Sequence, residues 1–204
     1  FDIPSPSNLL SKKQLKQKLK IPNNYFYLPN YYWLHKNHMV VLKTLNILKK
    51  KNIFVVSTGF NQDHRNLKHF IKIKKYIKDH KLEKNYLYLG LVSYKISMSL
   101  MLNSIAVINP SKFEGWSSSV EQAKSFGKKV ILSNISVHRE QNPKRSIFFN
   151  TDDHKSLSKI LIKCLKTYDE KKEIKITVNN FKFLENRMKK YGEDYLNKIN
   201  KIIN

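Results

Sequence analysis

The chain has 204 residues, of which 41% are apolar, so it is long enough for one domain with a substantial core and too apolar for a disordered protein. Its 39 lysine and arginine residues and 15 acidic residues give a formal net charge of +24, which attracts phosphates, anionic lipids or nucleic acid without choosing among them. The single cysteine, Cys164, excludes a disulfide framework and a cysteine zinc site and fits a small core residue. The absence of an apolar run of about 18 residues argues against a transmembrane helix.

Helix and strand patterns alternate along the first half of the chain. Leu42, Leu45 and Leu48 recur at helical spacing, and the apolar run 53–57 is typical of a buried parallel strand. The expected elements are a basic helix at 11–19, a strand at 25–28, a helix at 38–50, a strand at 53–57, a helix at 66–79 and a strand at 86–89.

The second half repeats this alternation and leads to the expected fold. The expected elements are helices at 97–103, 118–126 and 157–165, strands at 105–108, 130–132 and 147–149, and a charged helical tail from about Thr177 to Ile203. We interpret the polar stretches around His64 and His138 as loops. The pattern predicts an α/β fold, with a Rossmann-like parallel sheet, helices on both faces and a long C-terminal helix. In such a sheet, ligands bind at the edge formed by the carboxyl ends of the strands.

The candidate site is the segment 109–127, NPSKFEGWSSSVEQAKSFG. A strand ends at Pro110, a loop carries Glu114 and Gly115, and a helix is expected to begin around residues 117–119, where three serines are suitable N-caps. The first amides of this helix have no internal partners, so its start favours a phosphate. Gly115 lets a ligand approach the backbone closely. The carboxylate of Glu114 would repel a phosphate but can accept hydrogen bonds from sugar hydroxyls.

This segment resembles the signature of the retaining glycosyltransferases of family 4, or group 1, which have the two-domain B-type fold. Their pattern is Pro-Ser-x-x-Glu-Gly, a second glutamate eight positions after the first, and then Ala and Gly. The residues that match it are Pro110, Ser111, Glu114, Gly115, Ala123 and Gly127. The resemblance covers roughly residues 25–149 and, more loosely, the tail.

The resemblance implies that the chain is the C-terminal, donor-binding half of such an enzyme. Residues 1–24 would then be a linker and short helix from a missing N-terminal domain. Residues 25–176 would form the Rossmann-like nucleotide-sugar-binding domain, and residues 177–204 a helical tail similar to the one that crosses back to the partner domain.

Two positions depart from the family pattern. Gln122 stands at the second glutamate, which binds ribose hydroxyls in the family, while Glu121 is one residue early and would point about 100° away on a helix. Glutamine can still accept and donate hydrogen bonds but carries no charge, so we expect weaker ribose binding. Lys36 matches the family's phosphate-binding lysine, but Tyr31 stands where an arginine is expected. Lys36, helped by His35, would therefore carry more of the diphosphate charge.

The activity implied by the resemblance is transfer of a hexosyl group from a nucleoside diphosphate sugar with retention of configuration and without a metal or other cofactor. The implied catalytic residues are Lys36, which stabilises the departing diphosphate, and Glu114, which holds sugar hydroxyls. The implied donor-binding residues are Val92, in the loop that would line the base pocket, and Gly115, Trp116, Ser117, Ser118, Ser119 and Gln122. The acceptor, a glycan or a lipid-linked glycan, would bind the missing domain, so this chain alone is expected to bind donor but transfer poorly.

Two other functions stay open. The basic charge and aromatic content favour a nucleic-acid-binding module, but the lysines are spread along the chain, only 4 residues are arginine and no known motif is present. Gln122 and Tyr31 favour a scaffold that has lost catalysis. The basic surface also predicts a cytoplasmic protein that binds the anionic inner face of the membrane peripherally.

Overall fold

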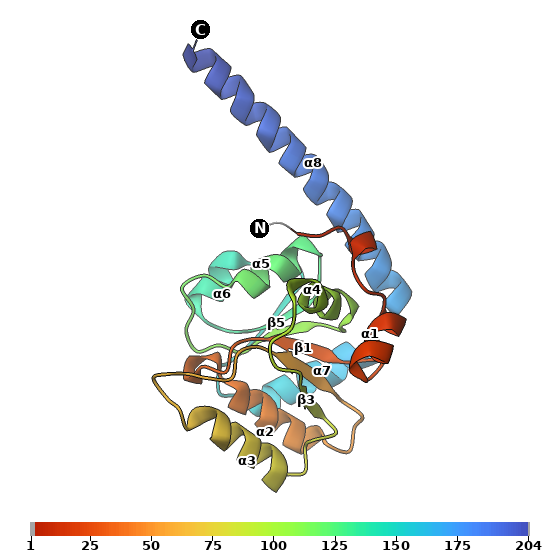
Figure 1. Cartoon of the computed structure of the whole chain (residues 1–204), viewed down its shortest axis with the longest axis vertical. Coiled ribbons are helices and arrows are strands. Elements are labelled where there is room, and N and C mark those ends of the chain that lie inside the picture. Colours follow the sequence, from red (N-terminus) through yellow and green to blue (C-terminus); the bar gives the residue numbers. More distant parts are fainter. Residues whose placement is uncertain (1–2, 204) are drawn as a thin grey trace.

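Six parallel strands form the central sheet, in the order β3-β2-β1-β4-β5-β6 (Figure 1). The computed structural model describes residues 3–203. The strands are β1 (Phe26–Pro29), β2 (Val55–Thr58), β3 (Tyr86–Tyr88), β4 (Val107–Asn109), β5 (Val130–Ser133) and β6 (Ser146–Phe149). The order reverses between β1 and β4, and open α/β sheets bind ligands at such a reversal. The predicted Rossmann-like parallel sheet is therefore confirmed, and the place for a ligand is the carboxyl edge at β1 and β4.

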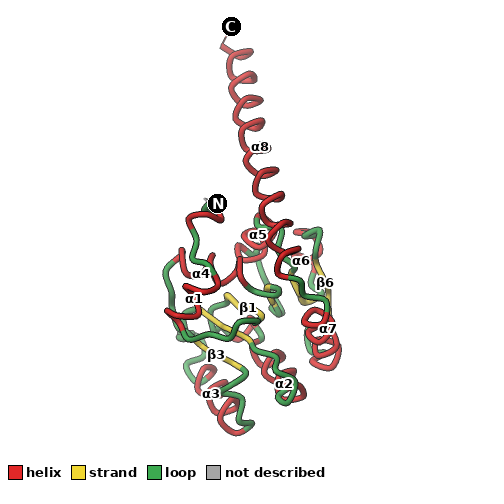
Figure 2. The backbone as a smooth tube through the Cα atoms, turned by 90° about the vertical axis from the view of Figure 1, so that its right-hand side faces the viewer, coloured by secondary structure: helices red, strands yellow, loops and turns green. Residues whose placement is uncertain are grey.

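Helices cover both faces of the sheet (Figures 1 and 2). One face carries α2 (His38–Leu48), α3 (His69–Asp79) and α7 (His154–Lys166). The other carries α1 (Lys12–Leu19), α4 (Tyr94–Asn103), α5 (Ser118–Ser125) and α6 (Ser136–Gln141). Short 3-10 turns, η1 (Pro6–Asn8) and η2 (Leu34–Lys36), precede α1 and α2, and the C-terminal helix α8 spans Glu170–Ile203.

Side chains that alternate along the strands build a separate core on each face. In β1, Phe26 and Leu28 pack into the core under α2 and α7, whereas Tyr27 packs into the core under α4 and α5. All three side chains are fully buried. Cys164 on α7 is 1% exposed, which confirms that it is a core residue.

The first described residues pack against α4 rather than extending away from the sheet. Ser11 caps α1 in a capping box with Gln14, and Leu15 is fully buried. The backbone of Leu10 is hydrogen-bonded to Ser99 and Asn103 of α4 at 3.0 Å each. Leu15 and Ile21 of the segment 1–24, which we predicted to be a linker and short helix from a missing N-terminal domain, thus lie in the core of this α/β unit.

Five helices differ from the sequence expectation, and two of them, α4 and α7, begin three residues earlier than predicted, at Tyr94 and His154. Helix α3 begins at His69, three residues later than predicted, because the preceding chain turns around Asp63, whose Oδ1 accepts hydrogen bonds from the backbone N (3.1 Å) and Nε (3.0 Å) of Arg65. The stretch around His138, interpreted as a loop, forms α6. Helix α8 begins at Glu170 rather than near Thr177, since the carboxylate of Asp169 accepts a hydrogen bond from the amide of Lys172 at 3.1 Å.

The start of α8 is tied to the sheet by charged groups. Glu173 accepts hydrogen bonds from Arg145 at 2.6 and 2.9 Å, and the ammonium of Lys128 lies 3.9 Å away. Lys128 is only 2% exposed and donates to the carbonyl of Ser104 at 2.7 Å. Farther along α8, Asn180 donates to the carbonyl of Ser125 on α5 at 2.6 Å, and beyond that contact the helix projects away from the α/β unit (Figures 1 and 2). Among the described residues, no helix is both long enough and apolar enough to cross a membrane.

Candidate functional site

Asn109, the last residue of β4, joins the two strands at which the sheet order reverses. Its side chain is fully buried. The amide Nδ2 donates to the hydroxyls of Ser117 (2.7 Å) and Ser119 (3.4 Å). The Oδ1 atom accepts from the hydroxyl of Ser111 (2.8 Å) and from Nδ2 of Asn30 after β1 (3.2 Å). One side chain thus fixes the loop after β4, the start of α5 and the end of β1 relative to one another.

Glu114 and Lys36 form an ion pair within this network. Lys36 Nζ lies 2.6 Å from Oε1 and 2.7 Å from Oε2 of Glu114, and the Ser111 hydroxyl donates to Oε1 at 2.7 Å. Glu114 is 7% exposed. Burial raises the pKa of this carboxyl, but the hydrogen bonds and charge of Lys36 and the Ser111 hydroxyl outweigh burial and lower the pKa below its ordinary value. The carboxyl of Glu114 is therefore ionised at neutral pH, and Lys36 is its direct ion-pair partner.

The start of α5 lies beside this pair and is not capped by a side chain. Ser117 is the N-cap residue, yet its hydroxyl bonds to Asn109 and makes no cap hydrogen bond. The three predicted N-cap serines therefore differ in role, since Ser117 and Ser119 are buried in the Asn109 network and Ser118 is exposed. The first amides of α5 remain without a side-chain cap, as a phosphate site requires.

The residues before α5 leave its start open. Trp116 is 52% exposed, so it is not a core residue. A Cβ atom placed on Gly115 would have no neighbour within 4 Å. The exposed Gly115–Trp116 peptide is thus accessible from solvent beside the buried carboxylate of Glu114.

The two remaining predicted donor residues lie farther along the same edge. On α5, Glu121 points toward α6, where its carboxylate accepts from Gln141 Nε2 at 3.1 Å, while the neighbouring Gln122 is half-exposed. The match of Gln122, rather than Glu121, to the family position stays a prediction. Val92 is half-exposed in the loop between β3 and α4. It lies at the carboxyl edge with the other predicted residues but makes no described hydrogen-bonded link to Glu114.

Comparison with known proteins agrees with this arrangement. The family described as "Glycosyl transferases group 1" matches residues 11–181, which is most of the chain. The chain belongs to the group 1 glycosyltransferases. A search of curated proteins found no match.

Solved structures share the fold of this group 1 glycosyltransferase at low sequence identity. A glycosyltransferase from Rickettsia africae is 20% identical with a TM-score of 0.67, and the match covers 93% of this chain and 52% of that one. Anabaena Alr3699/HepE, solved in complex with UDP, is 19% identical with a TM-score of 0.73, covering 92% and 51%. Sucrose-phosphate synthase from Thermosynechococcus elongatus is 13% identical with a TM-score of 0.69, covering 95% and 50%. The chain thus spans about half the length of these B-type glycosyltransferases.

Tyr31, which we predicted to stand at the position of the family's arginine, belongs to an aromatic cluster. Tyr31 is 45% exposed and makes edge contacts with Trp33 and Phe60, with ring centroids 5.4 and 6.3 Å apart. The guanidinium of Arg65, on the loop after β2, lies over the Trp33 ring at 5.1 Å from its centroid. This group 1 glycosyltransferase therefore has a cation, Arg65, beside the aromatic cluster that contains Tyr31.

Sequence reasoning missed two buried polar residues of the site. Asn109 was interpreted only as a strand end, and His138 as part of a loop. His138 is fully buried, and its Nδ1 lies 2.9 Å from the carbonyl of Ser133, to which it donates. Burial lowers the pKa of His138 and keeps the ring neutral. The Ser133 hydroxyl in turn donates to the carbonyl of Ser111, so α6 braces the loop that carries Glu114.

Proposed function

We propose that this group 1 glycosyltransferase chain binds a nucleoside diphosphate sugar and stabilises the diphosphate as it leaves. The observation that carries the proposal is the Lys36–Glu114 pair beside the uncapped start of α5, at the point where the strand order reverses. Helix N-termini at this place in α/β sheets bind phosphates through free amides. Alr3699/HepE has been solved with UDP and with UDP-glucose, so UDP-sugars are the first donors to test.

The proposed reaction breaks the bond between the anomeric carbon and the diphosphate oxygen and forms a bond from that carbon to an acceptor hydroxyl, with retention. The departing diphosphate takes the electron pair. Lys36 and the amides of residues 116–119 stabilise its charge, which commonly lowers a barrier by several kcal/mol. Glu114 accepts hydrogen bonds from hydroxyls of a hexosyl group, Gln122 binds the ribose, and the loop that carries Val92 lines the base. The cations are supplied by the chain, so the proposed mechanism uses no metal ion.

We further propose that the acceptor, a glycan or lipid-linked glycan, binds mainly to a second domain. This agrees with the match of the chain to about half of each similar structure. Residues 1–204 alone are then expected to bind donor and to show little transfer. Turnover by the isolated chain would contradict this division of labour.

The donor proposal is tested by calorimetric titration of UDP-, GDP- and ADP-sugars into the chain. We expect one of the three to bind with a dissociation constant below about 1 mM, and Glu114→Ala to weaken it at least tenfold, roughly the loss of one charge-assisted hydrogen bond. Glu83→Ala, which removes an exposed carboxylate remote from the site, is the matched control and should bind like the unmodified chain. If none of the donors binds at millimolar concentration, the scaffold alternative replaces the enzyme.

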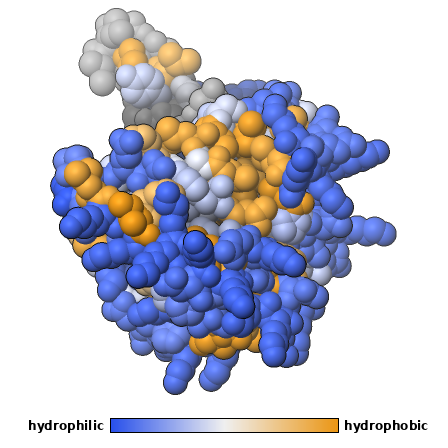
Figure 3. Space-filling view, turned by 60° about the horizontal axis from the view of Figure 1, so that its bottom comes forward, coloured by the Kyte–Doolittle hydropathy of each residue, from blue (hydrophilic) through white to orange (hydrophobic). Residues whose placement is uncertain are grey.

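We also propose that the protein works in the cytoplasm, at the anionic inner face of a membrane. The outer side of α3 and its preceding turn carry the exposed apolar residues Leu67 (74%) and Ile71 (61%) among exposed lysines such as Lys72 and Lys75. Figure 3 shows this side of the molecule as mostly hydrophilic with apolar islands. Lysines beside exposed apolar groups are typical of helices that lie on anionic lipid.

The membrane proposal predicts co-sedimentation with vesicles that contain 30% anionic lipid at about 0.1 M salt and release at about 1 M salt, because salt screens the attraction. Replacing Leu67 and Ile71 together with serine should weaken vesicle binding severalfold. Equal sedimentation with neutral and anionic vesicles would contradict it.

A further inference from the structure

The two neighbours of Lys36 fix the backbone around it to the loop after β4. The carbonyl of His35 accepts a hydrogen bond from the amide of Lys112 in that loop at 2.7 Å. Asn37, on the other side of Lys36, bonds to the same loop through its side chain. Lys36 itself pairs with Glu114 of this loop. The flexible side chain of Lys36 thus starts from a backbone that is fixed on both sides.

The side-chain amide of Asn37 joins three loops at the carboxyl edge of the sheet. Its Nδ2 donates to the carbonyl of Pro110 after β4 at 3.1 Å and to the carbonyl of Thr151 after β6 at 2.8 Å. Asn37 is 6% exposed, so water has little access to these hydrogen bonds. Removing a donor from such a place costs the desolvation of the acceptors that it leaves behind. The amide therefore holds the loop after β1 in place relative to the loops after β4 and β6.

The backbone of Asn37 has a left-handed conformation, with φ of 53° and ψ of 40°. Asparagine adopts this conformation more readily than most residues other than glycine. It ends η2, where the amide of Asn37 donates to the carbonyl of Leu34 at 3.2 Å, and α2 begins at the next residue, His38. Asn37 is the N-cap residue of α2, yet its side chain makes no cap hydrogen bond. The side chain thus serves the loops rather than the helix.

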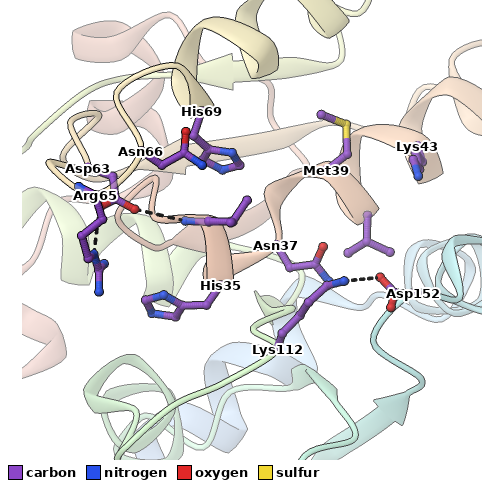
Figure 4. A pocket seen from close by; sticks show the side chains of 12 residues that line it. His35, Asn37, Met39, Lys43, Asp63, Arg65, Asn66, His69, Lys112 and Asp152 are labelled. Carbon is purple, nitrogen blue, oxygen red and sulfur yellow. Dashed lines mark hydrogen bonds and ion pairs between the residues drawn. The ribbon is translucent and has the colours of Figure 1, made fainter.

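A cavity of about 800 Å³ lies on one side of η2 (Figure 4). His35, Asn37 and Lys112 all line it. Figure 4 shows Asn37 next to Lys112, whose ammonium pairs with Asp152 at 2.7 Å. Side chains do not pack against η2 on the side of this cavity. The hydrogen bonds of Asn37 therefore have a large part in fixing the turn there.

We propose that Asn37 is a positioning residue, which holds η2 so that Lys36 stays against Glu114, beside the uncapped start of α5. Its contribution to donor binding rests on the proposed function. A lysine side chain is a flexible stem with about 2 kcal/mol of rotamer entropy, so a fixed backbone restricts the space that its ammonium explores. Groups that are already in place lose less freedom when a ligand binds, and the ligand binds more tightly.

The test combines Asn37→Gly and Lys36→Met in a double-mutant cycle, with calorimetric titration of UDP into the chain. Glycine adopts the left-handed conformation without strain, so Asn37→Gly removes the amide and keeps the turn. We expect Asn37→Gly to weaken UDP binding about three- to tenfold, and to have less than about a twofold effect once Lys36 is methionine. Asn52→Gly is the matched control and should leave the affinity unchanged, because Asn52 also has a positive φ, 51°, and is exposed in the turn before β2.

A second measurement does not depend on donor binding. Titration followed by NMR gives the pKa of Glu114, which lies below its ordinary value of 4.5 in the folded chain. In Asn37→Gly this pKa should rise toward 4.5, because Lys36 then contacts the carboxylate less. In Asn52→Gly it should not change. A residue that only stabilises the fold would leave the pKa of Glu114 as it is.

The outcomes separate this inference from the donor proposal. Equal weakening of UDP binding by Asn37→Gly with Lys36 and with methionine at that position would show that Asn37 does not act through Lys36, and the inference would be overturned. Unchanged UDP binding in Asn37→Gly would overturn it as well. If UDP does not bind the unmodified chain at millimolar concentration, the donor proposal fails, and the pKa of Glu114 alone decides whether Asn37 positions Lys36. An unchanged pKa in Asn37→Gly overturns the inference in either case.

Discussion

Lys36→Met is expected to lower the free energy of unfolding by about 3 kcal/mol at pH 7, because it leaves the Glu114 carboxylate buried without its partner. The side chains of Lys36 and Glu114 are 14% and 6% exposed, so water replaces little of the lost contact. The Ser111 hydroxyl keeps one hydrogen bond to the carboxylate, which limits the loss to the lower end of the range for buried pairs. Urea unfolding followed by circular dichroism measures the difference.

The pH dependence of this loss gives an independent check. In the folded chain the pKa of Glu114 lies below its ordinary value of 4.5, so its ionisation contributes stability above that pH. That contribution disappears as the pH falls through the folded pKa, because the carboxylate is then protonated. The deficit of Lys36→Met should therefore be largest at neutral pH and shrink below about pH 4.

A double variant isolates the buried charge. Lys36→Met combined with Glu114→Gln removes both charges and should recover about half of the lost stability or more. Lys159→Met, at an exposed position on α7, is the matched control and should change stability by less than about 0.5 kcal/mol. A Lys36→Met chain as stable as the unmodified one at pH 7 would show that the pair is not buried as described.

Glu173→Gln is expected to lower the free energy of unfolding by about 2–3 kcal/mol, since it removes the carboxylate that faces Arg145 and the buried ammonium of Lys128. The substitution keeps the side-chain volume, so the loss reports charge rather than packing. Glu170→Gln is the matched control on the same helix, because its pair with Lys12 is exposed and worth less than about 1 kcal/mol. Urea unfolding gives the stability, and limited proteolysis shows whether α8 separates from the sheet.

The loss of stability in Glu173→Gln should become smaller as the pH rises. Burial lowers the pKa of Lys128 to about 8, and the charge of Glu173 opposes that effect. Without Glu173 the folded pKa falls further, so Lys128 sheds its proton more readily and the cost of a buried, unpaired cation disappears at lower pH. The deficit should be greatest near pH 6 and smaller near pH 9. A loss of stability that does not change with pH would mean that the charge of Glu173 does not affect the protonation of Lys128.

The amino-acid sequence by itself determined the alternation of helices and strands, because spacing of apolar residues is a local property that sets which face of an element is buried. It also singled out the segment 109–127 as a candidate site and favoured Gln122 over Glu121, since helical geometry fixes how neighbouring side chains diverge, and both stay predictions. The boundaries of helices were predicted less accurately where a polar side chain accepts hydrogen bonds from the backbone, as Asp63 does before α3. Short α6 carried too few apolar positions to be recognised.

Only the tertiary structure decided which distant groups meet. Lys36 and Glu114 are brought together by the pairing of β1 with β4, and this pairing also lets Asn109 join three segments. Whether the carboxylate of Glu114 is exposed or buried against a lysine depends on the packing of elements far apart in the chain. The cavity lined by Leu34, Asp63, Lys112 and Asp152 has the same origin, because these residues lie on loops after four different strands and no local pattern encodes their convergence.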